Sequence, residues 1–159
     1  MTKINQNTLN DTVKLTGIGL HSGVKSEILI KPAEADHGIK FKRVDIKVDN
    51  IIDASHANVI DPVLCTKIKN TSGVSVSTVE HLMAAFYGEQ IDNALVEINA
   101  EEVPIMDGSA LEFVEAIKSV GIKKQNNLRK FIKVLKKVEI VEGSKYISIE
   151  PFDKDLIID

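Results

Sequence analysis

The chain has 159 residues, 43% of them apolar and 27% charged, a composition that suits a soluble globular protein of one domain or slightly more. Its formal net charge of −3 lacks the basic excess that binding to a phosphate backbone requires, so nucleic acid is not an expected partner. Cys65 is the only cysteine, the N-terminal region lacks a secretion signal, and no apolar run reaches the roughly 18 residues of a membrane span, so the sequence predicts a reduced, cytoplasmic protein.

The first part of the chain has the pattern of β-strands. Residues 12–20, 24–32 and 39–48 are rich in β-branched residues, alternate in part between apolar and polar, and are separated by turns that contain Gly, Pro or Asp. The simplest arrangement for consecutive strands of this kind is an antiparallel meander.

The apolar period becomes helical after residue 77. Apolar side chains recur at the spacing of one helical face, at Val79, Leu82, Met83 and Phe86. This spacing predicts a helix whose apolar face packs in the core. The opposite face carries a polar pair and two small residues, Glu80, His81, Ala84 and Ala85. Small residues in place of lysines and glutamates suggest that another segment approaches this face closely.

A strand at residues 93–100 and a second helix within residues 107–121 complete the first part. The second helix has an apolar stripe at Leu111, Val114 and Ile117, and Gly121 suits its C-terminal cap. Strands followed by two separate helices predict an α+β fold, a mainly antiparallel sheet with two helices layered on one face.

The polar residues 123–129 have the composition of a connector between domains. Residues 131–150 predict a β-hairpin with its turn at residues 142–145. A two-stranded hairpin is marginally stable without a covering layer. The hairpin therefore either adds to the first domain or begins a second one, in which case the sequence is the front part of a longer protein.

Two interpretations of Glu80 are open at this point. Ser77 and Glu80 have the spacing of a capping box, in which each side chain binds the other residue's backbone N–H. A glutamate beside a histidine also suits metal-assisted hydrolysis, in which imidazole holds Zn²⁺ and the carboxylate takes a proton from the bound water. His81 is the single histidine of the segment, so the zinc pattern is incomplete, and an ordinary packed or solvated histidine is the alternative.

A glycine-rich turn, GIGLHSG, occupies residues 17–23. No helix follows it, which argues against a phosphate-binding loop and favours a tight connection between strands with His21 exposed. Cys65, in the segment LCTKI, is a candidate site residue, but it is equally well explained as a small buried residue. The loop at residues 101–113 is explained by its turn residues and by a second capping-box spacing, Ser109 to Glu112.

The order of these segments is distinctive. GIGLHSG, LCT, STVEHLMAA and IDNALVEINAEEVPIMDGSA resemble the N-terminal half of the UDP-3-O-acyl-N-acetylglucosamine deacetylase family, zinc amidases that commit bacteria to lipid A synthesis. The resemblance runs from about Thr8 to the end of the sequence. It implies the first of two similar α+β domains, at residues 1–125, followed by the opening hairpin of the second, at residues 126–159, with the active site between the helical layers.

The resemblance also implies roles for individual residues. His81 is the zinc ligand of the first domain, and Glu80 is the general base that activates the metal-bound water. The residues implied in substrate binding or in lining the site are Leu20, His21, Leu64, Cys65 and Thr78. The loop containing Asp107 and Gly108 is mostly structural.

In this family the other zinc ligands and the proton donor belong to the second domain. The resemblance therefore implies Zn²⁺ as cofactor, a UDP-linked acylated glucosamine as substrate, and a missing C-terminal domain that completes the site. The 159-residue chain alone is expected to be inactive and prone to self-association. The alternative is a non-enzymatic relic or binding module of the same fold, because a fold does not establish an activity.

Overall fold

The computed structural model describes residues 4–60 and 63–153. The chain divides into two compact units, Met1–Arg129 and Lys130–Asp159. Within the described residues, the first unit combines two α-helices with three sheets, most of whose strand pairs are antiparallel, which confirms the predicted α+β class.

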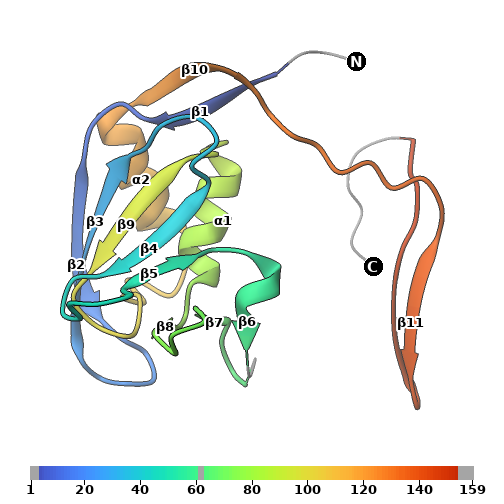
Figure 1. Cartoon of the computed structure of the whole chain (residues 1–159), viewed down its shortest axis with the longest axis horizontal. Helices are drawn as coiled ribbons and strands as arrows, with labels where there is room; N and C mark the ends of the chain where they lie inside the picture. Colours follow the sequence, from blue (N-terminus) through green and yellow to red (C-terminus); the bar gives the residue numbers. More distant parts are fainter. Residues whose placement is uncertain (1–3, 61–62, 154–159) are drawn as a thin grey trace. The chain divides into compact units, whose positions relative to one another are not determined.

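A five-stranded sheet forms the centre of the first unit (Figure 1). Its strand order is β2 (Val13–Ile18), β3 (Lys25–Pro32), β9 (Ala94–Ile98), β4 (Ile39–Arg43) and β5 (Ile51–Asp53). Neighbouring strands are antiparallel except β4 and β9, which are parallel. Strand β9 separates β3 from β4, so the predicted meander is wrong. The apolar β9 takes the central position because there it buries Ala94, Val96 and Ile98.

Strand β4 ends at Arg43, although the sequence predicts a strand to residue 48. The Arg43 guanidinium binds both carboxylate oxygens of Asp45, at 2.8 and 2.7 Å, and turns the chain there. The Asn50 amide then donates to the carbonyls of Arg43 and Ile46. These side-chain bonds within the turn compete with continuation of the strand.

Two smaller sheets flank the central one. Strands β6 (Val59–Ile60), β7 (Lys67–Lys69) and β8 (Ser75–Val76) form the first, after the short 3₁₀ helix η1 (His56–Asn58). The second pairs β1 (Asn5–Leu9) with β10 (Ile122–Leu128). Residues 123–129 thus form most of a strand and not the predicted connector. Polar side chains suit this strand because they take part in a hydrogen-bond network. The buried Asn93 side-chain amide donates to the side-chain oxygens of Gln6 in β1 and Gln125 in β10.

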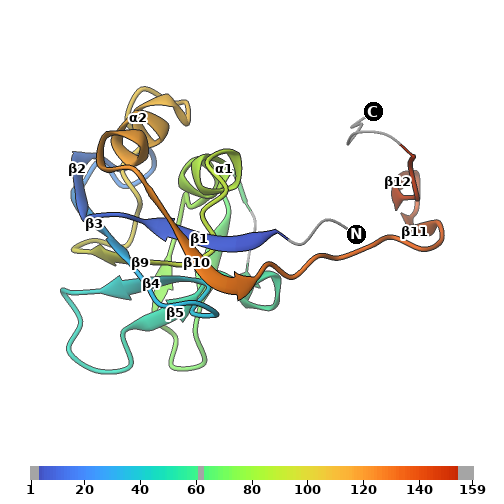
Figure 2. The ribbon, with the colours of Figure 1, turned by 90° about the horizontal axis from the view of Figure 1, so that it is seen from above.

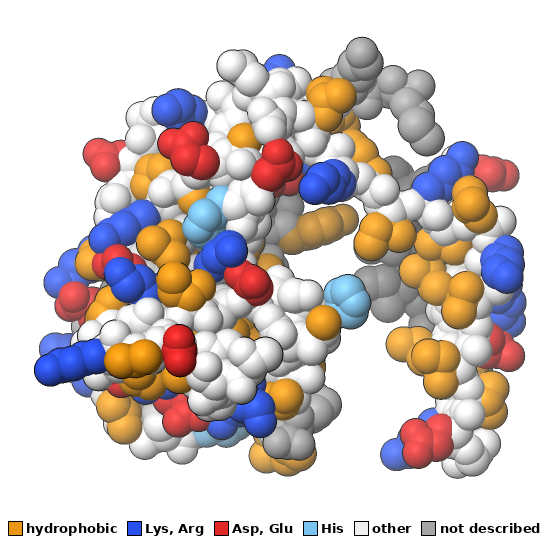
Figure 3. All heavy atoms as spheres, viewed as in Figure 1, with side chains coloured by type: hydrophobic (Ala, Val, Ile, Leu, Met, Phe, Trp, Pro, Cys, Tyr) orange, Lys and Arg blue, Asp and Glu red, His pale blue; other side chains and the backbone are white. Residues whose placement is uncertain are grey.

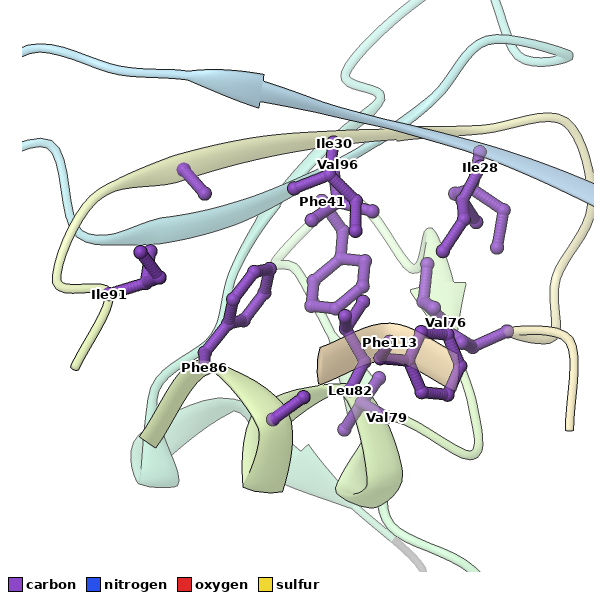
Figure 4. Packing of buried hydrophobic residues seen from close by; sticks show 14 of the residues in the cluster. Ile28, Ile30, Phe41, Val76, Val79, Leu82, Phe86, Ile91, Val96 and Phe113 are labelled. Carbon is purple, nitrogen blue, oxygen red and sulfur yellow. The ribbon is translucent and has the colours of Figure 1, made fainter. Parts of the chain in front are cut away.

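Helices α1 (Glu80–Gly88) and α2 (Leu111–Val120) lie on the same face of the central sheet (Figure 2). The core between them and the sheet contains Phe41, Leu82, Phe86, Val96 and Phe113 (Figure 4). Val79, Leu82 and Phe86 are at most 3% exposed, which confirms the predicted α1 stripe, while Met83 is half-buried.

The predicted stripe of α2 is wrong at Leu111, which is 55% exposed. Phe113 and Ile117 are the fully buried residues of this helix, because the larger Phe113 ring takes the core position. Gly121 ends the helix at a φ of 78°, with its N–H bound to the Lys118 carbonyl, so the predicted C-terminal cap is confirmed.

The second unit contains the predicted hairpin. Strands β11 (Val138–Glu142) and β12 (Lys145–Ile149) pair across a turn in which Gly143 has a φ of 61°. The register places Val138 opposite Ile149 and Ile140 opposite Ile147, so these four side chains share one face. They are 50–70% exposed, and hydrophobic side chains gather over the hairpin in Figure 3.

Candidate active site

Helix α1 begins without the capping box that the sequence suggests. The backbone N–H and the hydroxyl of Ser77 both donate to the Glu101 carbonyl, at 2.8 and 3.4 Å. The Glu80 carboxylate instead accepts a hydrogen bond of 3.1 Å from the backbone N–H of Thr66. The N-cap residue, Val79, makes no side-chain cap bond. The capping interpretation of Glu80 is therefore wrong, because long-range partners take both groups.

The segment that ends at Thr66 lies against this helix start. Besides the bond to Glu80, the Thr66 carbonyl accepts from the Val79 N–H at 3.4 Å. Leu64 is 86% exposed, with a φ of 62°, and Cys65 is half-buried. The two contacts hold Thr66 against the start of α1, and Leu64 and Cys65 directly precede Thr66 in the chain.

Thr78 precedes the helix in a left-handed conformation, with a φ of 57°. Its side chain is buried, and its hydroxyl donates to Glu102 Oε1 at 2.9 Å. A positive φ is unusual for a β-branched residue and costs on the order of 1–3 kcal/mol, so surrounding contacts must hold it. The bond to Glu102 is one such contact.

The glycine-rich turn lies on the other side of Glu102. The backbone N–H of His21 donates to Oε1 of Glu102 at 3.0 Å, and that of Ser22 donates to Oε2 at 2.8 Å. Leu20 is 60% exposed and the His21 side chain is exposed. The turn is therefore held through its backbone and presents these side chains outward.

Two glycines of this turn are required by close approaches. A Cβ atom added to Gly17 would lie 2.9 Å from Cβ of Pro104, and one added to Gly19 would lie 2.4 Å from Oε2 of Glu102. Neither position has room for a side chain. The Ile105 N–H also donates to the Ile18 carbonyl at 3.0 Å, which ties the 101–109 loop to the end of β2.

Asp107 lies in that loop and makes its bonds locally. The Ser109 backbone N–H and hydroxyl each donate to Oδ1 at 2.9 Å. These bonds lower the pKa of the Asp107 carboxyl, and the charge of His81 lowers it further by a smaller amount.

Ser109, two residues before α2, binds the start of the helix in a way that the sequence did not predict. Its hydroxyl accepts from the Leu111 N–H at 3.0 Å, while its own N–H is taken by Asp107. The predicted capping box between Ser109 and Glu112 is wrong, because Asp107 occupies the N–H that Glu112 needed.

The exposed face of α1 differs from the predicted one at a single residue. Glu80 and His81 are half-buried and Ala84 is exposed, but Ala85 is only 1% exposed. Ala85 lies three residues after Leu82 and so falls on the buried side of the helix. The small-residue face therefore contains Ala84 without Ala85.

Glu102 is the site feature that sequence reasoning missed. Glu101 and Glu102 are adjacent, yet Glu101 pairs with Lys67 and Glu102 is 3% exposed. Burial of Glu102 raises the pKa of its carboxyl, but hydrogen bonds from His21, Ser22 and Thr78 outweigh this effect and lower the pKa to about 2. The only available signal was a glutamate directly before an apolar Val-Pro pair.

The described residues do not complete a metal site. Across residues 4–60 and 63–153, no group of three or more His, Cys, Asp and Glu side chains is placed to hold a metal ion. A catalytic zinc ion normally has three protein ligands. His81 can supply one donor, but His21, Cys65 and His81 do not form a set of three.

In the same described ranges, no helix is long and apolar enough to cross a membrane.

Comparison with known proteins gives consistent matches. A sequence model of the family described as UDP-3-O-acyl N-acetylglycosamine deacetylase matches residues 6–159. A protein of Shewanella pealeana named UDP-3-O-acyl-N-acetylglucosamine deacetylase is 46% identical over 147 residues, which are 92% of this chain and 48% of the relative. Proteins of the same name from Xylella fastidiosa and Vibrio cholerae are 46% and 45% identical, over 93% and 94% of this chain. The chain spans about half the length of the curated relatives it matches.

Proposed function

Because the chain belongs to the UDP-3-O-acyl N-acetylglycosamine deacetylase family, we propose that the complete protein is a cytoplasmic, zinc-dependent deacetylase of lipid A biosynthesis. Its substrate is UDP-3-O-acyl-N-acetylglucosamine, and its products are acetate and the free amine at the 2-position. One observation carries the proposal: segments far apart in the sequence meet at the start of α1. Thr66 binds Glu80 there, and Glu102 joins the glycine-rich turn to Thr78.

Glu80 is the general base of this proposal. The Thr66 N–H fixes one oxygen of its carboxylate and occupies one of about four acceptor positions, so the others are free to accept a proton from the hydrolytic water. This placement supports a base better than a cap, because a capping glutamate would direct its oxygens at the backbone of its own helix.

His81 is the one zinc ligand that we assign to this chain. It follows Glu80 directly in the first turn of α1 and is half-buried. The remaining zinc ligands and the proton donor for the leaving amine belong to the part of the family proteins that this sequence does not contain.

The remaining site residues take part in binding. Leu20, His21 and Leu64 present exposed side chains from segments anchored at the start of α1, which supports their assignment to substrate contacts. Cys65 lines the same region from a half-buried position. The buried Thr78 contributes by setting where the helix begins.

The experiment is an assay of acetate release from UDP-3-O-acyl-N-acetylglucosamine. The protein encoded by the complete reading frame is tested, together with the 159-residue chain with and without a separately expressed C-terminal half. Turnover by the complete protein, and restoration of turnover when the halves are mixed, support the deacetylase. No turnover in any arm, from protein that is folded and loaded with zinc, supports the non-enzymatic alternative.

A further inference from the structure

Glu102 joins two segments that are far apart in the sequence. Its Oε1 accepts from the His21 N–H and from the Thr78 hydroxyl, and its Oε2 accepts from the Ser22 N–H, at 2.8–3.0 Å. His21 is 81 residues away and Thr78 is 24 residues away. Both carboxylate oxygens of this buried side chain are therefore used by the protein itself.

The carboxylate stays charged at every pH at which the protein is expected to work. Burial disfavours the charged form, yet the surrounding donors lower the pKa of Glu102 to about 2. Charge-assisted hydrogen bonds are shorter and stronger than neutral ones, so they hold their donors tightly.

The segments around the Glu102 carboxylate pack closely against it. A Cβ atom at Gly19 would lie 2.4 Å from Oε2, so the turn can approach this closely only with glycine there. On the other side, Thr78 is held in the left-handed region directly before Val79 and Glu80. A shift of the carboxylate would therefore move both segments.

We propose that Glu102 is a positioning residue, which fixes the 19–22 turn, and with it Leu20 and His21, relative to Glu80 and His81. This inference rests on the proposed function of the site. Glu97 provides the contrast, because its carboxylate pairs with Lys31 and Lys42 on the central sheet. Glu102 acts through the backbone of the turn and not by contact with the substrate.

The first test measures amide hydrogen exchange at His21 and Ser22 by NMR in the 159-residue chain. Glutamine has one acceptor oxygen and would turn its NH₂ group toward a donor, so Glu102→Gln is expected to speed exchange of these two amides at least about tenfold. Amides of β3 and β9 are expected to keep their protection. Glu97→Gln is the matched control and should leave His21 and Ser22 unchanged. Unaltered protection of both amides in Glu102→Gln would overturn the proposal.

A second variant covers the case in which Glu102→Gln does not fold. Gly19→Ala retains the carboxylate but places a methyl group 2.4 Å from Oε2. It is expected to speed exchange of the same two amides. If folded Gly19→Ala protein keeps the protection of the wild type, the close approach does not hold the turn and the proposal fails.

The third test measures activity and zinc content in the complete protein. Glu102→Gln should lower kcat/KM about 10- to 100-fold with zinc content unchanged, because small misplacements of site groups have effects of this size. In a His21→Ala background the same change should cost less than it does in the wild type, since part of its effect passes through His21. An equal loss in both backgrounds would show that Glu102 acts elsewhere.

The exchange measurement and the activity measurement separate the positioning proposal from the proposed function. Should the complete wild-type protein release no acetate, the proposed function fails, while the exchange measurement still decides whether Glu102 holds the turn.

Discussion

The backbone N–H of Thr66 donates a hydrogen bond to the Glu80 carboxylate at the first residue of α1, across 14 positions of sequence. One contact thus separates the two interpretations of Glu80 that the sequence left open, because a carboxylate bound to Thr66 is not closing a capping box. It also orients the side chain that we assign as general base.

Replacement of Glu80 by glutamine in the complete protein is expected to lower kcat about 10²- to 10⁴-fold, the usual cost of losing one positioned base. Glutamine can still accept the Thr66 N–H but cannot take a proton from water, so the fold and the zinc content should stay nearly intact. Steady-state kinetics and elemental analysis of the same preparation test this.

Glu89→Gln is the control for that experiment. Glu89 follows the last residue of α1 and pairs with Lys118 at 3.4 Å, so its replacement removes the same charge far from the helix start. It should leave kcat within about twofold, because Glu89 lies at the opposite end of α1 from Glu80. Near-normal kcat in Glu80→Gln would refute the catalytic assignment.

Acid should destabilise the first unit partly through Glu102. Its pKa is about 2 in the folded protein and 4.5 ordinarily, so the stabilisation is complete above pH 4.5 and is lost as the pH falls toward 2. Between pH 6 and pH 3 the loss amounts to about 2 kcal/mol for such a pair of pKa values.

Urea unfolding of wild type and Glu102→Gln at both pH values isolates this contribution. Other carboxylates with lowered pKa values, including Asp45 and Glu97, lose stabilisation in both proteins and cancel in the difference. The free-energy gap between the two proteins should therefore shrink by about 2 kcal/mol at pH 3. A gap that is independent of pH contradicts the assignment of this titration to Glu102.

The sequence predicted local patterns well where apolar periodicity decides the structure. The α1 stripe of Val79, Leu82 and Phe86 and the glycine cap of α2 were found because each depends on neighbours within a few positions. The capping box of Ser77 and Glu80 failed for the opposite reason, because its hydroxyl and its carboxylate have partners distant in the sequence, at Glu101 and Thr66. The capping box of Ser109 and Glu112 failed because Asp107, two residues before Ser109, takes the Ser109 N–H.

The predictions of the strand order and of the connector were wrong for a related reason. The parallel pairing of β4 with β9 joins residues 55 positions apart, and β10 pairs with β1 across most of the first unit. No local propensity encodes such pairings, which depend on which strand buries more apolar surface. The domain boundary near residue 125 stays a prediction.

The 159-residue chain is expected to self-associate through its hairpin. Val138, Ile140, Ile147 and Ile149 form one apolar face and are 50–70% exposed. A two-stranded hairpin with an uncovered apolar face invites association with another copy. Analytical ultracentrifugation over a range of concentrations should show oligomers that Ile147→Lys reduces.

Ser148→Lys is the matched control, since it adds the same charge one residue later on the opposite face of β12. It should leave the association of the chain nearly unchanged. Equal effects of the two substitutions would attribute the association to net charge and not to the apolar face.

The 159-residue chain alone is expected neither to hold zinc tightly nor to release acetate. Within residues 4–60 and 63–153, no three potential ligands converge on one point, whereas a catalytic zinc ion normally needs three. A histidine alone, such as His81, binds zinc too weakly to survive dialysis against a mild chelator. Elemental analysis after such dialysis should therefore find far less than one zinc per chain, and His81→Ala should not lower that residual content further. Stoichiometric zinc that disappears in His81→Ala, together with turnover by the chain alone, would show that the chain completes its site without the second domain.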